Sequence, residues 1–144
     1  GYLFLESNVF ELLSVYLSEV LELSILSSGY ISISKSDRDS ITEAKRIIDS
    51  QLAFAPSCEE LAKKVNISVS KLTKGFNSLF GTSVHAYIID QRLEKAAGLL
   101  LESDLNVSQI AMLVGYSKPS NFAAAFKKKY GVIPKNYKDE NTIG

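Results

Sequence analysis

The side chains that could perform catalysis are few in this sequence of 144 residues. An enzyme needs a nucleophile with a neighbouring base, or a set of metal ligands. The sequence has one cysteine, Cys58, and one histidine, His85, without a motif spacing or a glycine-rich phosphate loop to support them. A single cysteine also excludes an internal disulfide and any multi-cysteine metal site, which suits a reducing compartment. We therefore predict that the protein is not an enzyme and that it holds no metal or other cofactor.

The distribution of charge indicates a different chemistry, the binding of a polyanion. The net charge is zero at pH 7, with 16 basic and 16 acidic residues. Residues 1–36 carry four glutamates against one lysine, whereas residues 56–138 carry twelve basic residues against six acidic ones. This asymmetry favours a nucleic-acid partner for the second half of the chain, although a modest basic excess is also typical of a solvated surface.

The elements that must position these charges repeat along residues 60–137. Leu61-Ala62 recurs as Ile110-Ala111, and the segment Val65–Ser68 recurs as Val114–Ser117, both 49 residues later. The offset then becomes 50, and it relates Leu72 to Phe122, Phe76 to Phe126, Phe80-Gly81 to Tyr130-Gly131, and Tyr87 to Tyr137. Similarity kept in order across one inserted residue indicates two copies of one structural unit.

Each copy has the pattern of a helix-turn-helix. Ala62 and Ala111 are small enough for a second helix to cross closely. Four residues later come Asn66 and Gly115, the residue types that accept left-handed backbone angles most readily. A serine then follows in each copy, Ser68 or Ser117, and we expect it to cap the next helix.

Between the copies, residues 83–101 show helical spacing of apolar side chains and contain no proline. About 18 residues at about 1.5 Å each give a helix of roughly 27 Å, while successive major grooves on one face of DNA lie about 34 Å apart. The sequence therefore predicts an all-α fold with two helix-turn-helix subdomains, at about 57–80 and 107–130, joined by a long linker helix. We place this DNA-binding domain at residues 37–144.

Residues 1–36 are predicted to be an N-terminal appendage. Residues 3–26 have the pattern of an amphipathic helix whose apolar stripe includes Val9, Leu12, Leu13, Tyr16, Leu17 and Val20. Such a stripe must be covered by the helix's own domain, by a second copy in a homodimer, or by a missing domain. A serine-rich linker at Ser27–Ser36 follows, and the next helix is expected to start near Asp37–Ser40 with Ser40 and Glu43 as a capping box.

Composition favours a soluble, cytoplasmic protein. Hydrophobic residues make up 46% of the chain and charged residues 22%, which is enough apolar surface for a core. The longest uncharged run, Leu23–Ser34, has 12 residues and is rich in serine, too short and too polar to span a bilayer. The absence of an initiator Met at position 1 suggests a fragment of a longer protein.

Residues 58–138 resemble the C-terminal DNA-binding domain of the AraC/XylS family of bacterial transcription regulators. The resemblance rests on the segments Glu60–Ser68, Phe80–Ser83, Arg92–Ala96, Val107–Ala111, Val114–Ser117, Phe126–Val132 and Pro134–Lys138. Lys71–Phe76 is similar to the subgroup that controls siderophore uptake. The resemblance implies a regulator, expected to be an activator, that binds double-stranded DNA and RNA polymerase and whose small-molecule effector binds only in a missing domain.

The resemblance also implies which residues meet DNA bases. In the first unit these are Ser70, Lys71, Thr73 and Lys74. Lysine can donate to guanine and threonine can touch a thymine methyl, although contact with phosphate alone is the alternative for the lysines. In the second unit the matching positions are Lys118, Ser120, Asn121, Ala123 and Ala124. Because Ala124 cannot donate a hydrogen bond, we expect the second unit to read bases poorly, and Asn121 could instead cap or pack internally.

The expected phosphate contacts are Ser68, Arg92, Lys127, Lys128 and Lys129. For the lysine run the alternative is a solvated face. For Arg92 the alternative is an ion pair with Asp90 or Glu94. The alternative function for the whole chain is a helical protein-interaction module that uses the N-terminal apolar stripe, but that reading leaves the internal repeat unexplained.

Overall fold

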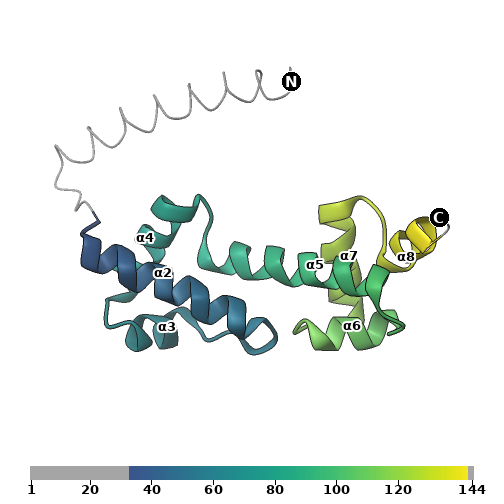
Figure 1. Cartoon of the computed structure of the whole chain (residues 1–144), viewed down its shortest axis with the longest axis horizontal. Coiled ribbons are helices and arrows are strands. Elements are labelled where there is room, and N and C mark those ends of the chain that lie inside the picture. The colour runs from purple at the N-terminus through teal and green to yellow at the C-terminus, as the bar shows by residue number, and fades with distance from the viewer. Residues whose placement is uncertain (1–32, 143–144) are drawn as a thin grey trace, which may run out of the picture. The chain divides into compact units, whose positions relative to one another are not determined.

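The structure is a computed structural model, and it describes residues 33–142. Every element in this range is a helix, and no strand occurs in it (Figure 1). The elements are α2 (Lys35–Ser50), the short 3-10 helix η1 (Leu52–Phe54), α3 (Cys58–Lys64), α4 (Val69–Phe80), α5 (Val84–Glu102), α6 (Val107–Leu113), α7 (Pro119–Tyr130) and α8 (Pro134–Thr142). We call residues 35–80 the first unit and residues 107–142 the second unit, with α5 between them.

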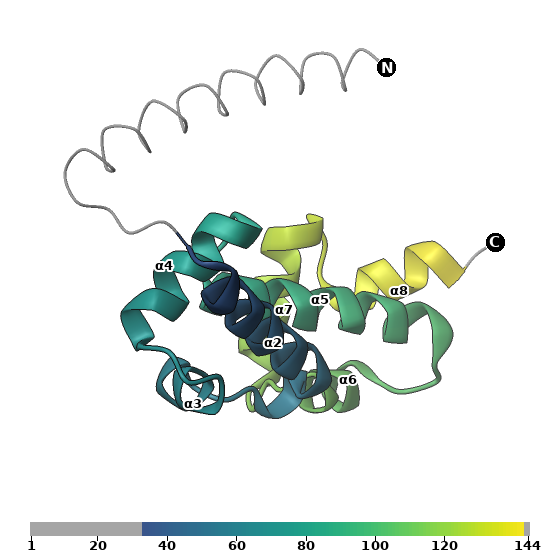
Figure 2. The same ribbon diagram turned by 60° about the vertical axis from the view of Figure 1, so that its left-hand side comes forward.

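In the first unit, α2 packs on α3 and α4 (Figure 2). Its buried face consists of Ile41, Ala44 and Ile48, spaced three and four residues apart as one side of a helix requires. Beneath it lie Leu61 of α3 and Leu72 and Phe76 of α4, all with no exposed surface. The core of this unit is therefore formed by the apolar sides of these three helices.

The start of α2 differs from the expectation. The helix begins at Lys35, so Ser40 lies inside it and the predicted capping box with Glu43 is wrong. Inside a helix the amide of residue 43 pairs with the carbonyl four residues earlier, and no orphan donor remains for a serine to cap. The Glu43 carboxylate instead accepts hydrogen bonds from Arg46, the shortest at 2.6 Å.

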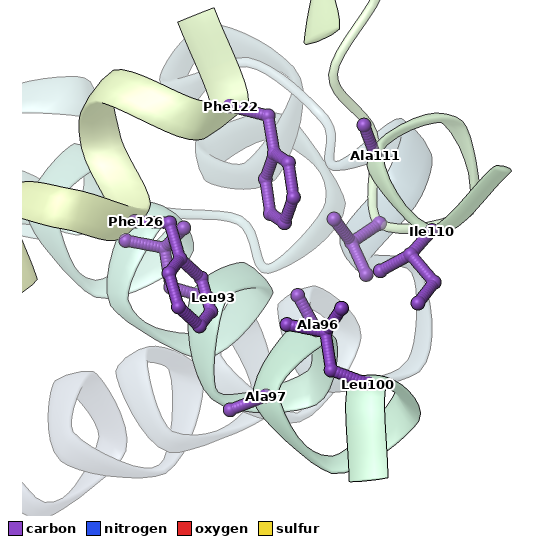
Figure 3. Close-up of a cluster of buried hydrophobic side chains, with 9 residues drawn as sticks. Leu93, Ala96, Ala97, Leu100, Ile110, Ala111, Phe122 and Phe126 are labelled. Carbon is purple, nitrogen blue, oxygen red and sulfur yellow. The ribbon is translucent and has the colours of Figure 1, made fainter. Parts of the chain in front are cut away.

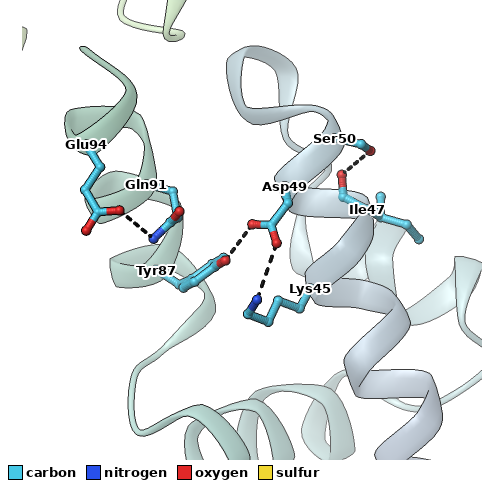
Figure 4. A network of polar contacts seen from close by, with 7 residues as sticks. All are labelled: Lys45, Ile47, Asp49, Ser50, Tyr87, Gln91 and Glu94. Atoms are coloured by element: carbon cyan, nitrogen blue, oxygen red, sulfur yellow. Dashed lines mark hydrogen bonds and ion pairs between the residues drawn. The ribbon is translucent and has the colours of Figure 1, made fainter. Parts of the chain in front are cut away.

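A polar contact fastens α2 to α5 (Figure 4). The Tyr87 hydroxyl donates to Asp49 Oδ1 at 2.5 Å, and Lys45 Nζ donates to Asp49 Oδ2 at 3.4 Å. Burial raises the pKa of Tyr87, and its hydrogen bond to Asp49 raises it further, so the hydroxyl remains a donor at neutral pH. This contact holds the beginning of α5 against the first unit.

The core of the second unit is built by α5, α6 and α7 (Figure 3). Phe122 and Phe126 project from α7 between α5 and α6, and both are fully buried. Phe126 also lies 5.2 Å from Tyr137 of α8, ring centre to ring centre, in an edge-to-face contact. The terminal helix is thereby anchored to the same core.

The linker helix α5 belongs to both units. Its buried residues Leu93, Ala96 and Leu100 follow Ile41, Ala44 and Ile48 of α2 by 52 residues each, so the second half of α5 plays the part of α2. Its first half, with Val84 and Tyr87, matches Pro134 and Tyr137 of α8, 50 residues later. The first of these correspondences escaped the sequence analysis because it consists only of apolar spacing.

The predicted fold class is confirmed for the described residues, with two helix-turn-helix subdomains and a long helix between them. The predicted N-terminal amphipathic helix at residues 3–26 lies outside the described residues. None of the described helices has the length and apolar character to span a membrane.

Candidate nucleic-acid interface

The first helix-turn-helix consists of α3, a tight turn and α4. Ser57 caps α3 through a capping box with Glu60. Asn66 takes the left-handed conformation at φ 59°, and the Ile67 amide donates to the Ala62 carbonyl at 3.0 Å to close the turn. Ser68 then caps α4, its Oγ accepting from the Lys71 amide at 3.1 Å. The residue types predicted for this turn thus have the predicted roles.

The second helix-turn-helix repeats this backbone with one change. Asn106 and Gln109 form the capping box of α6, Gly115 has φ 106°, and the Tyr116 amide donates to the Ala111 carbonyl at 2.8 Å. The prediction that Ser117 caps the recognition helix is wrong, because Lys118 is the N-cap residue and makes no side-chain cap bond. Pro119 explains the shift, since its fixed φ and missing amide suit the first helical position.

The exposed face of α4 carries the predicted residues Ser70, Lys71, Thr73 and Lys74, while Leu72, Gly75 and Phe76 are buried. Asn77 and Ser78 extend the same face by one more turn. These two residues were not predicted, although helical spacing from Thr73 and Lys74 places them on this face. The side chains of α4 therefore divide cleanly between core and solvent.

One of the α4 lysines has a partner inside the protein. Lys71 Nζ lies 3.3 Å from Asp37 Oδ2 of α2, and the Asp37 side chain is only 18% exposed. This ion pair fixes the direction of the Lys71 side chain. A nucleic acid that takes over Lys71 must compete with Asp37 for it.

The exposed face of α7 is chemically poorer. Lys118, Ser120 and Asn121 are exposed at or just before its first turn, and Ala124 is exposed one turn later. The exposure of Asn121 does not fit the alternative that it packs internally. Beyond the first turn, the face opposite Phe122 and Phe126 offers methyl groups until the lysine run begins.

The lysine run occupies the last turn of α7, where positive charge also complements the helix dipole. Lys127 and Lys128 are exposed. Lys129 instead donates to Asp90 Oδ1 of α5, and this hydrogen bond raises the pKa of Lys129. The three predicted phosphate ligands thus separate into two exposed lysines and one engaged in joining α7 to α5.

Arg92, one of the predicted phosphate ligands, has a partner inside the protein, and its role toward phosphate stays a prediction. It is partly buried, and its Nε donates to the Leu52 carbonyl of η1 at 2.8 Å. The alternative ion pair of Arg92 with Asp90 or Glu94 is not formed in the described residues, where Asp90 binds Lys129 and Glu94 accepts from Gln91. Sequence reasoning could not find this contact, which joins residues 40 positions apart.

Cys58 and His85, the residues considered for catalysis, lie in the first turns of α3 and α5. Cys58 is the first residue of α3, and burial, with a smaller effect of the Glu59 charge, raises the pKa of its thiol. A protonated thiol is a poor nucleophile. Within residues 33–142 no group of three His, Cys, Asp or Glu side chains could hold a metal ion.

Comparisons with known proteins agree with this architecture. A family model described as a helix-turn-helix domain matches residues 61–140. The chain is 32% identical over 102 residues to the xylose operon regulatory protein of Escherichia coli strain K12, covering 71% of this chain and 26% of that protein. The chain therefore spans about a quarter of the length of this relative.

Two solved structures are similar in fold. The DNA-binding domain of AdpA, solved in complex with a target DNA, is 26% identical, with a TM-score of 0.67 over 70% of this chain and 91% of that one. An AraC-type regulator from Chromobacterium violaceum is 21% identical and shows the fold alone, with a TM-score of 0.68 over 76% of this chain and 98% of that one. Together with the family match, these findings establish that the chain belongs to the AraC-type family of helix-turn-helix transcription regulators, of which it is a DNA-binding domain.

Proposed function

We propose that this domain binds double-stranded DNA sequence-specifically by placing α4 and α7 in adjacent major grooves. The observation that carries the proposal is the pair of matching turns, each followed by a helix with one buried and one exposed face. A helix presented in this way fits the width of the major groove. The AdpA domain, which has the same fold, was solved on its target DNA.

In this proposal α4 is the main reader of bases. Ser70, Lys71, Thr73 and Lys74 are its base-contacting residues. The Thr73 hydroxyl donates to the Val69 carbonyl at 3.0 Å, which leaves its oxygen lone pairs and its methyl group for the groove. A methyl group suits the thymine methyl, and a lysine suits guanine O6 and N7.

The contribution of α7 is weaker for bases. Lys118, Ser120 and Asn121 can reach base edges or phosphates from the first turn, whereas Ala124 offers only a methyl group. Lys127 and Lys128 are proposed phosphate ligands. Ser68 can donate its hydroxyl hydrogen to a phosphate while its oxygen caps α4, and a phosphate that binds Lys129 must share its ammonium group with Asp90.

The role of the whole protein is proposed from the family. We infer that this domain serves a cytoplasmic regulator that activates transcription through RNA polymerase and binds its small-molecule effector in another domain. A homodimer through Val9, Leu12, Leu13, Tyr16, Leu17 and Val20 remains a prediction from the sequence, and so does the siderophore subgroup.

The experiment that tests DNA reading is in vitro selection of this chain on random-sequence duplex DNA, followed by sequencing. We expect two enriched blocks about one helical turn apart, the stronger of which changes when Lys71 and Lys74 are replaced. A single block would overturn the reading of two grooves and would leave α7 with backbone contacts only. No enrichment above a salt-sensitive background would overturn the proposal and favour the protein-interaction module.

A further inference from the structure

We propose that Arg92 is a positioning residue that fixes the relative orientation of the two recognition helices, through a contact in which η1 of the first unit meets the second unit beside the linker helix. The contact consists of Leu52 and Ala53 of η1, Arg92 of α5 and Gly115 in the second turn, and we call it the inter-unit contact. The proposal rests on the proposed function, since the relative orientation of α4 and α7 affects DNA binding only if both helices enter DNA.

The first part of the inter-unit contact joins α5 to the first unit. η1 follows α2 after one residue and packs against α5. The Arg92 Nε donates to the Leu52 carbonyl at 2.8 Å in a partly buried position. A guanidinium keeps its charge at all physiological pH values and presents several donors in a rigid plane. An arginine is therefore suited to donate to a carbonyl oxygen that is partly shielded from solvent.

The second part joins η1 to the second unit. A methyl group built on Gly115 would lie 2.9 Å from the Ala53 carbonyl oxygen, 3.0 Å from Ala53 Cα and 3.0 Å from Arg92 Cζ. The turn of the second helix-turn-helix thus rests directly on η1 and on the Arg92 guanidinium. The approach to the Ala53 carbonyl oxygen is closer than real side-chain carbons show, so any side chain at this position would force the backbone of η1 to shift.

The equivalent position in the first unit shows that the turn itself does not require this space. Asn66 occupies it, with a side chain and with positive φ. Gly81 and Gly131, which also have positive φ, have nothing within 4 Å of a built methyl group. The crowding at Gly115 therefore reflects contact between the units and not the demands of a tight turn.

Tyr116 adds to the same region. Its hydroxyl is buried and has no hydrogen-bond partner among the described residues. Burial raises its pKa, and the nearby positive charge of Arg92 lowers it in part. Arg92 thus lies between a carbonyl of the first unit and the turn residues Gly115 and Tyr116 of the second.

The consequence concerns DNA spacing. Two units joined by a single helix can twist about it, whereas a second connection beside the helix prevents the twist. One base pair inserted between two binding blocks rotates them by about 35° relative to each other. A rigid pair of units should bind DNA of altered spacing more weakly, and a loosely joined pair should bind it about as tightly as the original spacing.

The test uses the two-block duplex selected by the full chain, the same duplex with one base pair inserted or removed between the blocks, and a duplex with the stronger block alone. For the wild type we expect a loss of about tenfold or more on either altered spacing, since engagement of both units depends on geometry. Arg92→Met should bind the single block within about twofold of the wild type and lower the spacing discrimination to less than about threefold. Arg92→Lys should fall between them.

Lys63→Met is the matched control, because Lys63 is an exposed cation on α3 and lies outside the inter-unit contact. It should keep the full spacing discrimination. If circular dichroism shows that Arg92→Met is unfolded, Arg92→Lys carries the test.

The outcomes separate the two proposals. A wild type that ignores spacing, or that selects one block, overturns two-groove binding and this inference with it. A wild type that rejects altered spacing, with Arg92 variants that reject it equally, overturns this inference alone. Variants that lose single-block and two-block binding by the same factor also overturn it, because that pattern is a general loss of structure.

Discussion

In the first helix-turn-helix the turn carries Asn66 at φ 59°, and in the second it carries Gly115 at φ 106°. The closing hydrogen bonds of the two turns are nearly the same, at 3.0 and 2.8 Å. The turns differ in their surroundings, because Asn66 is exposed whereas Gly115 lies directly against η1. A repeated backbone can thus require different residues at equivalent positions, according to the contacts made there.

The recognition helices differ in the same manner. α4 carries its two lysines, Lys71 and Lys74, along the middle of its exposed face, whereas α7 has an alanine face and collects its lysines in the last turn. The core side is alike in both, since Phe76 and Phe126 are each fully buried among aromatic rings. The comparison indicates that the two units share the same core packing but present different side chains on their exposed faces.

The largest expected effect tests whether the two cores are equivalent. Phe126→Ala and Phe76→Ala should each reduce the free energy of unfolding by about 3–5 kcal/mol, since each leaves a cavity in a fully buried aromatic cluster. Urea denaturation followed by circular dichroism measures the loss, with Lys128→Ala on the exposed face of α7 as the control. A loss below about 1 kcal/mol for either phenylalanine would contradict the equivalence.

The next effect separates the two turns. Gly115→Ala should cost about 3 kcal/mol of unfolding free energy, from positive φ on a non-glycine residue and from overlap with Ala53. Asn66→Ala should cost about 1 kcal/mol, because only the backbone conformation is strained. Asn66→Gly serves as the control and should be close to neutral. Equal losses for the two alanine variants would show that the approach of η1 to Gly115 is not tight.

A smaller effect distinguishes base reading from phosphate contact. Replacing Lys71 and Lys74 together by Gln should weaken binding to the selected DNA by about tenfold, or about 1.4 kcal/mol, and change the selected sequence. Replacing Lys127 and Lys128 by Gln should weaken binding to all DNA sequences alike and make the negative slope of log K against log salt shallower by about two. If both pairs behave like the second, α4 contacts phosphates only.

The smallest effect concerns the ion pair between Lys129 and Asp90. Asp90→Asn should cost less than about 1 kcal/mol of stability, since the pair is partly exposed. Because the hydrogen bond to Asp90 raises the pKa of Lys129, its contribution is complete below the unfolded-state value of about 10.4 and is lost as pH rises through the higher folded-state value. The free energy of unfolding should therefore fall less between pH 7 and pH 11 in Asp90→Asn than in the wild type, as urea denaturation at the two pH values would measure.

Much of the fold could be predicted because it is encoded locally. The apolar spacing of Ile41, Ala44 and Ile48, the left-handed residues Asn66 and Gly115 and the cap at Ser68 each depend on a few neighbouring positions. The two capping errors arose where a local pattern competed with its surroundings. Ser40 has a capping sequence but lies inside a longer helix, and Ser117 was displaced by Pro119.

The candidate site was only partly predictable for the same reason. The exposed faces of α4 and α7 follow from helical spacing and from the family resemblance. The partners of Lys71, Arg92 and Lys129 do not, because each lies at least 34 residues away in the sequence.

The sequence by itself determined the two helix-turn-helix units, their turns and the residues on their exposed faces, since these depend on spacing, capping and backbone preference within about one helical turn. Only the tertiary structure decided which basic side chains are engaged inside the protein, and that η1 and Arg92 bring the first unit against Gly115 of the second. Those contacts depend on how helices distant in sequence pack together. The side chains that carry them have no local preference that would reveal them in advance.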